Sequence, residues 1–115
     1  MEFWATWCVP CRFSTPSLDV IYRKFHRRGV TVLLINVGES VERVRNWVNG
    51  RFQAPVLLDQ DTRVAWRYGI QGIPQLLIVD QAGQIVHVRS GYGEGLERDL
   101  KWILTDLLAS GRNAR

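Results

Sequence analysis

Apolar residues return along the chain at intervals that predict an alternating order of strands and helices. Residues 2–6 are mostly apolar or aromatic and predict a short strand. From about Val9 to Arg28 the apolar side chains recur every three or four residues, which predicts a helix whose buried face is formed by Leu18, Ile21, Tyr22 and Phe25. Pro16 lies inside this segment and predicts a kink, because proline removes one helical hydrogen bond.

The middle of the chain repeats the alternation on a smaller scale. Val30 to Val37 are almost uninterrupted apolar residues, a pattern typical of a strand in a parallel sheet covered on both faces. A second helix is predicted near Ser40 to Gly50, with Ser40 as its N-terminal cap. Pro55 to Leu58 predict a short strand, and residues 61–68 predict a short helix.

The last third of the chain predicts two paired strands and a long helix. Residues 75–79 and 85–89 flank a turn sequence and predict an antiparallel hairpin. Residues 94–109 fit helical spacing, and Gly111 is predicted to end this helix. The expected fold class is therefore α/β, a central mixed β-sheet with helices on both faces and a C-terminal β-hairpin plus helix. With 115 residues and 46% apolar composition, residues 1–115 are predicted to be a single domain.

The charge of the chain narrows the classes of partner only slightly. Lys and Arg number 15 and Asp and Glu number 11, so the net charge is +4, and it is dispersed. We predict no nucleic-acid partner from this distribution. The densest basic stretch, residues 23–28, falls at the expected end of the first helix, where cations suit the helix dipole. A basic docking patch is the alternative interpretation of this stretch.

The two cysteines form a single motif, Cys8-Val9-Pro10-Cys11, and the chain has no others. A Cys-x-x-Cys pair is typical of thiol redox chemistry, whereas structural disulfides usually join segments far apart in sequence. The alternatives are an inert disulfide and a zinc half-site. Zinc would need two further ligands, and only His26 and His87 are available. We therefore predict no metal and no cofactor beyond the Cys8–Cys11 disulfide itself.

The predicted elements give the two cysteines different roles. A strand that runs into a helix places Cys8 at the helix N-terminus, where unpaired N–H groups and the helix dipole stabilise a thiolate. Cys11 lies one turn further on and is predicted to attack a mixed disulfide formed on Cys8. Val9 and Pro10 are uncharged, which predicts a potential nearer roughly −270 mV than roughly −120 mV.

Two motifs in this order of elements resemble a known superfamily. One is the run from Phe3 to Arg12, with Pro16 five residues after Cys11, and the other is Gly72-Ile73-Pro74 before a hydrophobic strand that ends in Asp80. They resemble the thioredoxin superfamily, and the first is similar to its TlpA/ResA-like branch. The resemblance implies a thioredoxin-like fold and a thiol–disulfide oxidoreductase, a protein disulfide reductase that uses oxidised protein substrates and a thiol electron donor. A general cytosolic thioredoxin and a non-catalytic binding module of this fold are the alternatives.

The resemblance also implies a set of substrate-binding residues. Pro74 matches the proline that the family holds in the cis form opposite the cysteines, and Ile73 before it would offer its backbone to an extended substrate. A trans-proline at a strand start is the alternative for Pro74. Gly91 matches a glycine in the loop that completes the groove. Trp7 and Pro10 are predicted to line the same docking surface.

The chain departs from the family pattern at two positions, both of which concern an acidic residue. The TlpA/ResA-like branch commonly has glutamate three residues after the second cysteine, and Ser14 stands there instead. Conversely Glu2 lies six residues before Cys8, where thioredoxin itself has a buried aspartate that accepts a proton from the resolving thiol. If Glu2 is buried, its pKa rises and it suits this role. The alternative is a terminal glutamate in water.

The resemblance favours an extracytoplasmic location, in the periplasm or associated with a membrane. Members of the TlpA/ResA-like branch are associated with cytochrome c maturation and with envelope thiol maintenance, and the resemblance implies one of these roles. The sequence contains neither a secretory leader nor a run near the roughly 20 apolar residues of a membrane span. Because residues 2–6 open the chain as a strand, we expect a shortened N-terminus and a longer, membrane-anchored natural protein. We also expect association through that short first strand, because it would leave a sheet edge underprotected.

Overall fold

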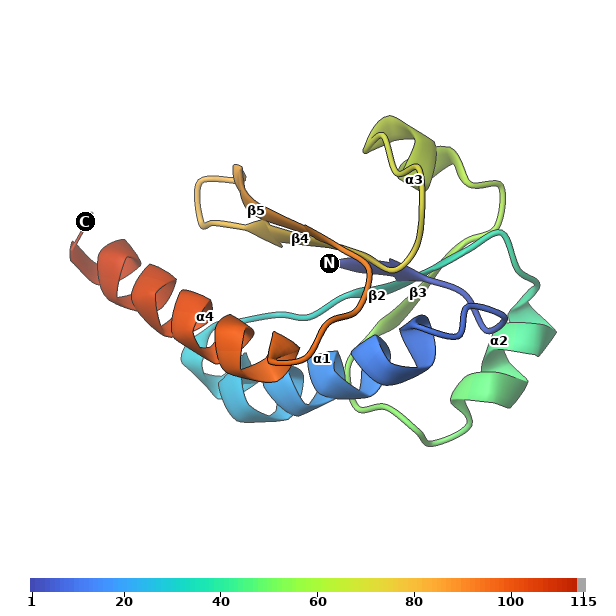
Figure 1. The fold of residues 1–115 in the computed structure, drawn as a ribbon, viewed down its shortest axis with the longest axis horizontal. Helices are drawn as coiled ribbons and strands as arrows, with labels where there is room; N and C mark the ends of the chain where they lie inside the picture. The colour runs from blue at the N-terminus through green and yellow to red at the C-terminus, as the bar shows by residue number, and fades with distance from the viewer. Residues whose placement is uncertain (114–115) are drawn as a thin grey trace.

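The computed structural model describes residues 1–113, which form one five-stranded sheet with helices on both faces (Figure 1). The strands lie in the order β3-β2-β1-β4-β5. The elements along the chain are β1 (Glu2–Trp4), α1 (Cys11–Phe25), β2 (Leu34–Val37), α2 (Val41–Val48), β3 (Val56–Asp59), α3 (Arg63–Arg67), β4 (Gln75–Val79), β5 (Ile85–Ser90) and α4 (Leu96–Asn113).

The sheet is mixed, and β1 is its central strand. β1, β2 and β3 run parallel to one another, while β4 is antiparallel to both β1 and β5. The predicted hairpin is therefore confirmed as β4 and β5. The premise that the first strand is an unprotected sheet edge was wrong, because β1 is paired on both sides and the sheet edges are β3 and β5. Association of the chain with a second copy stays a prediction.

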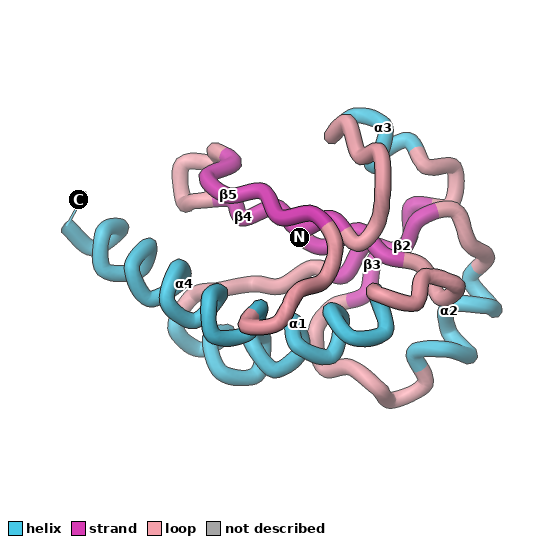
Figure 2. The backbone as a smooth tube through the Cα atoms, in the orientation of Figure 1, coloured by secondary structure: helices cyan, strands magenta, loops and turns pink. Residues whose placement is uncertain are grey.

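The helices divide unequally between the two faces of the sheet (Figure 2). α1, α2 and α4 cover one face, where the larger core cluster includes Trp4, Leu18, Val44 and Leu100. α3 lies over the opposite face, where a smaller cluster joins Phe3, Ile35, Ala65 and Leu77. Phe3 and Trp4 are neighbours in β1 and enter opposite clusters, as the alternation of side chains along a strand requires. The prediction of helices on both faces is confirmed.

Two elements differ in length from the predictions. The apolar run from Val30 became a strand only at Leu34, although Val32 is buried at 4% exposure. A continuous apolar run reports burial, and burial does not require ladder pairing. The final helix continues to Asn113, so the prediction that Gly111 ends it was wrong. One glycine costs a helix about 1 kcal/mol, which flanking helical residues can offset.

The first helix begins later than its apolar pattern predicted. Pro10 is its N-cap, Cys11 is its first residue, and a short 3-10 turn from His26 to Arg28 follows its end. Pro16 lies inside the helix, as expected. Because the helix starts at Cys11, the turn between β1 and α1 holds the rest of the cysteine motif.

Candidate active site

The two cysteines form a disulfide in the turn between β1 and α1. Their Cα atoms are 5.2 Å apart. Both are buried, at 4% exposure for Cys8 and 1% for Cys11. The Cys11 N–H donates a hydrogen bond of 3.3 Å to Cys8 Sγ, so an amide of the first helical turn points at the first sulfur. This arrangement favours a thiolate on Cys8 after reduction.

Exposed apolar side chains surround this buried pair. Trp7 and Val9, on either side of Cys8, are 63% and 59% exposed. Phe13 is 57% exposed and its ring lies 5.7 Å from that of Tyr92, which belongs to the loop after β5. A gathering of large exposed apolar side chains is the pattern found at surfaces that bind another molecule. Sequence reasoning proposed Trp7 but missed Phe13 and Tyr92, since their proximity depends on how α1 and that loop meet.

The loop before β4 carries the second predicted motif. The Ile73–Pro74 peptide bond is cis, as expected from the resemblance. Gly91 has a φ of +73°, a left-handed conformation that favours glycine, and its N–H donates to the carbonyl of Pro74 at 2.9 Å. The loop that contains Gly91 is thereby fastened to the loop that contains Pro74. Pro74 is buried, and Ile73 is half-buried.

The register of the sheet brings this loop beside the cysteine turn. In the antiparallel pair of β1 and β4, Phe3 lies opposite Gln75. One residue further along, the same register places Pro74 beside Trp4, and the chain reaches Cys8 four residues after Trp4. Pro10, by contrast, is an exposed helix cap. All of the predicted substrate-binding residues therefore belong to the two loops at this end of the sheet or to the adjoining loop after β5.

Glu2 lies inside the protein beneath the cysteine turn. Its side chain is 2% exposed, and its Oε1 accepts a hydrogen bond of 3.1 Å from Ser14 Oγ. Burial raises the pKa of Glu2 to about 8, although the hydrogen bond from Ser14 lowers it in part. The burial on which the predicted proton-transfer role depended is thus present. The two departures from the family pattern, Ser14 and Glu2, contact each other one helical turn from Cys11.

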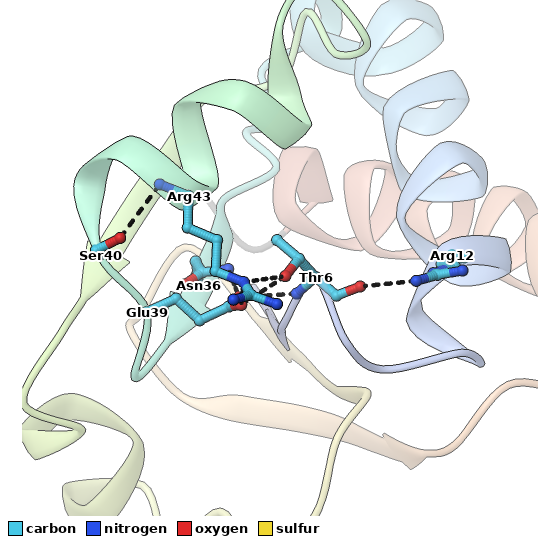
Figure 3. Close-up of polar contacts among 6 residues, drawn as sticks. All are labelled: Thr6, Arg12, Asn36, Glu39, Ser40 and Arg43. Atoms are coloured by element: carbon cyan, nitrogen blue, oxygen red, sulfur yellow. Dashed lines mark hydrogen bonds and ion pairs between the residues drawn. The ribbon is translucent and has the colours of Figure 1, made fainter.

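A second buried glutamate, Glu39, holds Thr6 at the start of the cysteine turn (Figure 3). Glu39 Oε1 accepts from the Thr6 N–H at 2.7 Å, and its Oε2 accepts from Thr6 Oγ1 at 2.5 Å. Asn36 Nδ2 donates to Oε1 at 2.8 Å, and Arg43 Nε lies 3.2 Å from Oε2. Sequence reasoning missed Glu39, because Thr6 is 33 residues away along the chain.

The environment of Glu39 holds its carboxyl in the charged form. Burial by itself raises the pKa, but the hydrogen bonds from Thr6 and Asn36 and the charge of Arg43 outweigh it. The pKa of Glu39 consequently lies below its usual value of 4.5. This carboxylate fixes the backbone at Thr6, two residues before Cys8.

The two histidines named as possible zinc ligands lie on other elements than the cysteine turn. No group of three or more His, Cys, Asp or Glu side chains gathers in residues 1–113. His26 is exposed, with Nδ1 3.0 Å from the carbonyl oxygen of Tyr22, and His87 is exposed on β5. Within that same range, no helix has the length and apolar character needed to cross a bilayer.

The sheet order and the disulfide at the start of α1, with a cis-proline loop beside it, define a thioredoxin-like domain with a Cys-x-x-Cys redox centre. A family model described as AhpC/TSA family matches residues 1–88. The chain belongs to the AhpC/TSA family. The resemblance to the TlpA/ResA-like branch of the thioredoxin superfamily is confirmed by the relatives that follow.

Named relatives and solved structures agree with this assignment. The chain is 34% identical over 92 residues to the thiol-disulfide oxidoreductase ResA of Bacillus subtilis (strain 168), a match that covers 79% of this chain and 51% of that protein. It spans about half the length of the curated relatives it matches. A thiol:disulfide interchange protein of the thioredoxin family from Chlorobium tepidum TLS superposes with a TM-score of 0.80 at 27% identity, covering 93% of this chain and 77% of that one. The pneumococcal exposed lipoprotein thioredoxin Etrx1, from Streptococcus pneumoniae strain TIGR4, superposes with a TM-score of 0.72 at 28% identity, covering 92% and 82% respectively.

Proposed function

We propose that this domain is a thiol–disulfide oxidoreductase that reduces disulfides in proteins. The observation that carries the proposal is the Cys8–Cys11 disulfide at the start of α1, ringed by exposed apolar side chains. A buried and inert cross-link would need no such surface. The relative with 34% identity is named a thiol-disulfide oxidoreductase, which supports the same chemistry.

The first half of the reaction takes place at Cys8. In the reduced domain, the Cys8 thiolate attacks one sulfur of the substrate disulfide. A Cys8–substrate disulfide forms, the substrate S–S bond breaks, and the departing substrate thiolate takes a proton from water. Trp7, Ile73 and Pro74 hold the substrate chain across the sulfur during this step, and the hydrogen bond from the Cys11 N–H stabilises the thiolate beforehand.

The second half releases the substrate through Cys11. The Cys11 thiol loses its proton to the Glu2 carboxylate, and the new thiolate attacks Cys8 Sγ. The Cys8–Cys11 disulfide forms, the Cys8–substrate disulfide breaks, and the second substrate sulfur leaves as a thiolate that takes a proton from water. A pKa of about 8 for Glu2 lies close to the roughly 8.5 of an ordinary thiol, so the proton moves between groups of similar affinity. The two electrons come from a thiol donor that reduces the domain again.

Trapping experiments test the assignment of the two sulfurs. The Cys11→Ser variant should accumulate a mixed disulfide with a disulfide-bonded protein or peptide, because the intermediate on Cys8 then has no resolving thiol. The matched Cys8→Ser variant should form far less of it, since Cys11 is only 1% exposed. Mass spectrometry of alkylated samples distinguishes the two. Equal trapping by both variants would contradict the assigned roles.

The reduction potential tests the direction of the reaction. We expect a reversible two-electron couple against dithiothreitol and glutathione, nearer roughly −270 mV than roughly −120 mV. A potential close to the upper figure would instead indicate an oxidase-like domain. A pair that does not exchange at all, in a domain that still binds a partner, would indicate the non-catalytic binding module.

We place the natural protein outside the cytoplasm, anchored to a membrane. The name of the 28% identical relative, an exposed lipoprotein thioredoxin, supports this location. Protease accessibility of the full-length protein in intact cells tests it. A role in cytochrome c maturation stays a prediction, and the reduction of a peptide with an oxidised Cys-x-x-Cys-His haem-attachment motif is its direct test.

A further inference from the structure

Two arginines stack on one tryptophan beside the cysteine turn. The guanidinium carbon of Arg12 lies 5.1 Å from the centroid of the Trp47 ring, and that of Arg51 lies 4.5 Å from it. Trp47 is half-buried and packs against the core, while both arginines are exposed. We call Arg12, Trp47 and Arg51 the arginine stack.

Each guanidinium in the arginine stack is oriented by a backbone carbonyl. Arg12 Nη2 donates to the carbonyl of Thr6 at 3.4 Å, as Figure 3 shows, and Arg51 Nε donates to the carbonyl of Trp47 at 2.7 Å. The remaining N–H groups of both side chains have no protein partner in residues 1–113. A fixed guanidinium with free donors is suited to bind a carboxylate with two parallel hydrogen bonds.

No carboxylate of residues 1–113 forms an ion pair with either arginine. The buried acids on the adjoining elements are already occupied. Asp19 accepts from the N–H groups of residues 53 and 54 and pairs with Arg23, while Glu39 is held by the contacts described above. Two like charges on one ring repel each other, and the ring quadrupole compensates only in part. An acidic ligand would remove this repulsion.

One member of the arginine stack, Arg12, is close to the reacting cysteines in the sequence. Arg12 directly follows Cys11, and the carbonyl that Arg12 binds belongs to Thr6, two residues before Cys8. A substrate joined to Cys8 as a mixed disulfide extends at most about 3.6 Å per residue. Three extended substrate residues span at most roughly 10 Å, so the residues next to the substrate cysteine are the ones placed to meet Arg12, the residue that follows Cys11.

We propose that the arginine stack binds an acidic segment next to the disulfide of the protein substrate and so sets substrate preference. This inference rests on the proposed reductase function and adds the chemical class of substrate. Asp and Glu side chains are the occupants that fit, because they supply planar carboxylates to two exposed guanidinium groups near the site of exchange.

Two synthetic peptides test the proposal. Both contain the same intramolecular disulfide, which is flanked by Asp and Glu in one and by Ser and Gln in the other. The reduced wild-type domain should show a kcat/KM about fivefold higher for the acidic peptide, the size expected for two exposed ion pairs. The preference should shrink at high salt, because exposed charges are screened. In the R12Q/R51Q double variant the ratio of the two kcat/KM values should fall to near one.

A matched double variant separates a local effect from net charge. R27Q/R67Q removes two exposed arginines that lie outside the arginine stack, and it should keep the wild-type ratio. Equal ratios in the wild type and in R12Q/R51Q would overturn the inference, provided that both peptides are reduced. Reduction of neither peptide would instead count against the proposed function. Binding of anionic vesicles that R12Q/R51Q abolishes, without any peptide preference, would also overturn the inference and assign the arginine stack to a membrane surface.

Discussion

Two buried glutamates lie near the start of the cysteine turn, and their pKa values are shifted in opposite directions. Glu2, on β1, is 2% exposed and has a pKa raised to about 8. Glu39, after β2, is 8% exposed and has a pKa below its usual value. Burial raises the pKa of a carboxyl in both places, so burial does not explain the difference.

The difference lies in the hydrogen-bond donors that each carboxyl receives. Among residues 1–113, Glu2 has one side-chain donor, the hydroxyl of Ser14. Glu39 receives both the amide and the hydroxyl of Thr6, the Asn36 amide, and an ion pair with Arg43. Donors replace the water that a carboxylate loses on burial, and with enough of them the charged form is favoured.

Because their pKa values differ, Glu2 and Glu39 are suited to different roles. A carboxyl that stays charged at all physiological pH values cannot exchange protons, but it can hold the backbone at Thr6 in place. A carboxyl with a pKa of about 8 can exchange a proton with a thiol near neutral pH. Glu2 is therefore the candidate for proton transfer and Glu39 the anchor of the turn.

The largest expected effect is on the pH dependence of stability at Glu2. The folded pKa is raised, so the native state binds the extra proton and stability falls as pH rises from about 4.5 to about 8. We expect the free energy of unfolding of the oxidised domain to fall by about 1.4 kcal/mol per pH unit more than that of Glu2→Gln between pH 5 and 7. Urea denaturation of both proteins measures this difference. Parallel pH profiles would refute the raised pKa.

The same variant tests the role of Glu2 in the reaction. In the wild type, the rate of release from the mixed disulfide should rise with pH through about 8, as Glu2 becomes able to accept the Cys11 proton. Glu2→Gln should lose that limb and retain only the thiol titration. Stopped-flow measurement of substrate release across pH 6 to 10 reports it. An unchanged profile would remove Glu2 from the mechanism even if its pKa is raised.

The sequence was sufficient to predict Glu2 as a candidate but not to predict its environment. Its distance from Cys8 along the chain matched a family position, and local motifs likewise identified Cys8, Cys11 and Pro74. Burial of Glu2 depended on β1 becoming the central strand, which residues 2–6 alone could not establish. The prediction that the first strand is an unpaired edge of the sheet was wrong for the same reason.

Glu39 was beyond sequence reasoning for a related reason. Its partners at Thr6 and Asn36 meet it only because β1 and β2 pair in register, with Trp4 opposite Asn36. No motif marks the position, and Glu39 lies in a loop where an acid is normally assumed to be solvated. Local sequence patterns predicted the helices, the strands and the sulfur chemistry, whereas contacts between these elements determined the pKa values of Glu2 and Glu39.

The second prediction concerns the negative charge of Glu39. Glu39→Gln should lower the free energy of unfolding at pH 7 by about 2 kcal/mol, the scale of charged hydrogen bonds lost inside a protein. The folded pKa is depressed, so this contribution is present above about 4.5 and is lost as pH falls through the lower folded value. Urea denaturation at pH 7 and at pH 3 should show a smaller deficit at the lower pH. A deficit of equal size at both would contradict the assigned charge.

The third prediction concerns the hydrogen bond that Glu2 accepts from Ser14. Ser14→Ala removes the hydrogen bond that lowers the Glu2 pKa, so that pKa should rise further, by an amount that corresponds to about 1 kcal/mol. The pH midpoint of substrate release should shift upward. Ser17→Ala is a suitable control, because Ser17 is on the same helix and its hydroxyl bonds only to the carbonyl of Phe13. A shift of equal size in the control would show that the effect comes from the helix and not from Glu2.

The smallest effect is expected at Arg43, which carries the only full positive charge paired with Glu39 among residues 1–113. The Arg43 side chain is 65% exposed, so water screens the pair, and Arg43→Gln should change the free energy of unfolding by about 0.5 kcal/mol or less. Arg63→Gln, which breaks a pair between two exposed side chains, is the matched control. If Arg43→Gln instead cost as much as Glu39→Gln, the ion pair, and not the neutral donors from Thr6 and Asn36, would be what keeps Glu39 charged. Arg43 alone would then explain why the pKa of Glu39 is lowered while that of Glu2 is raised.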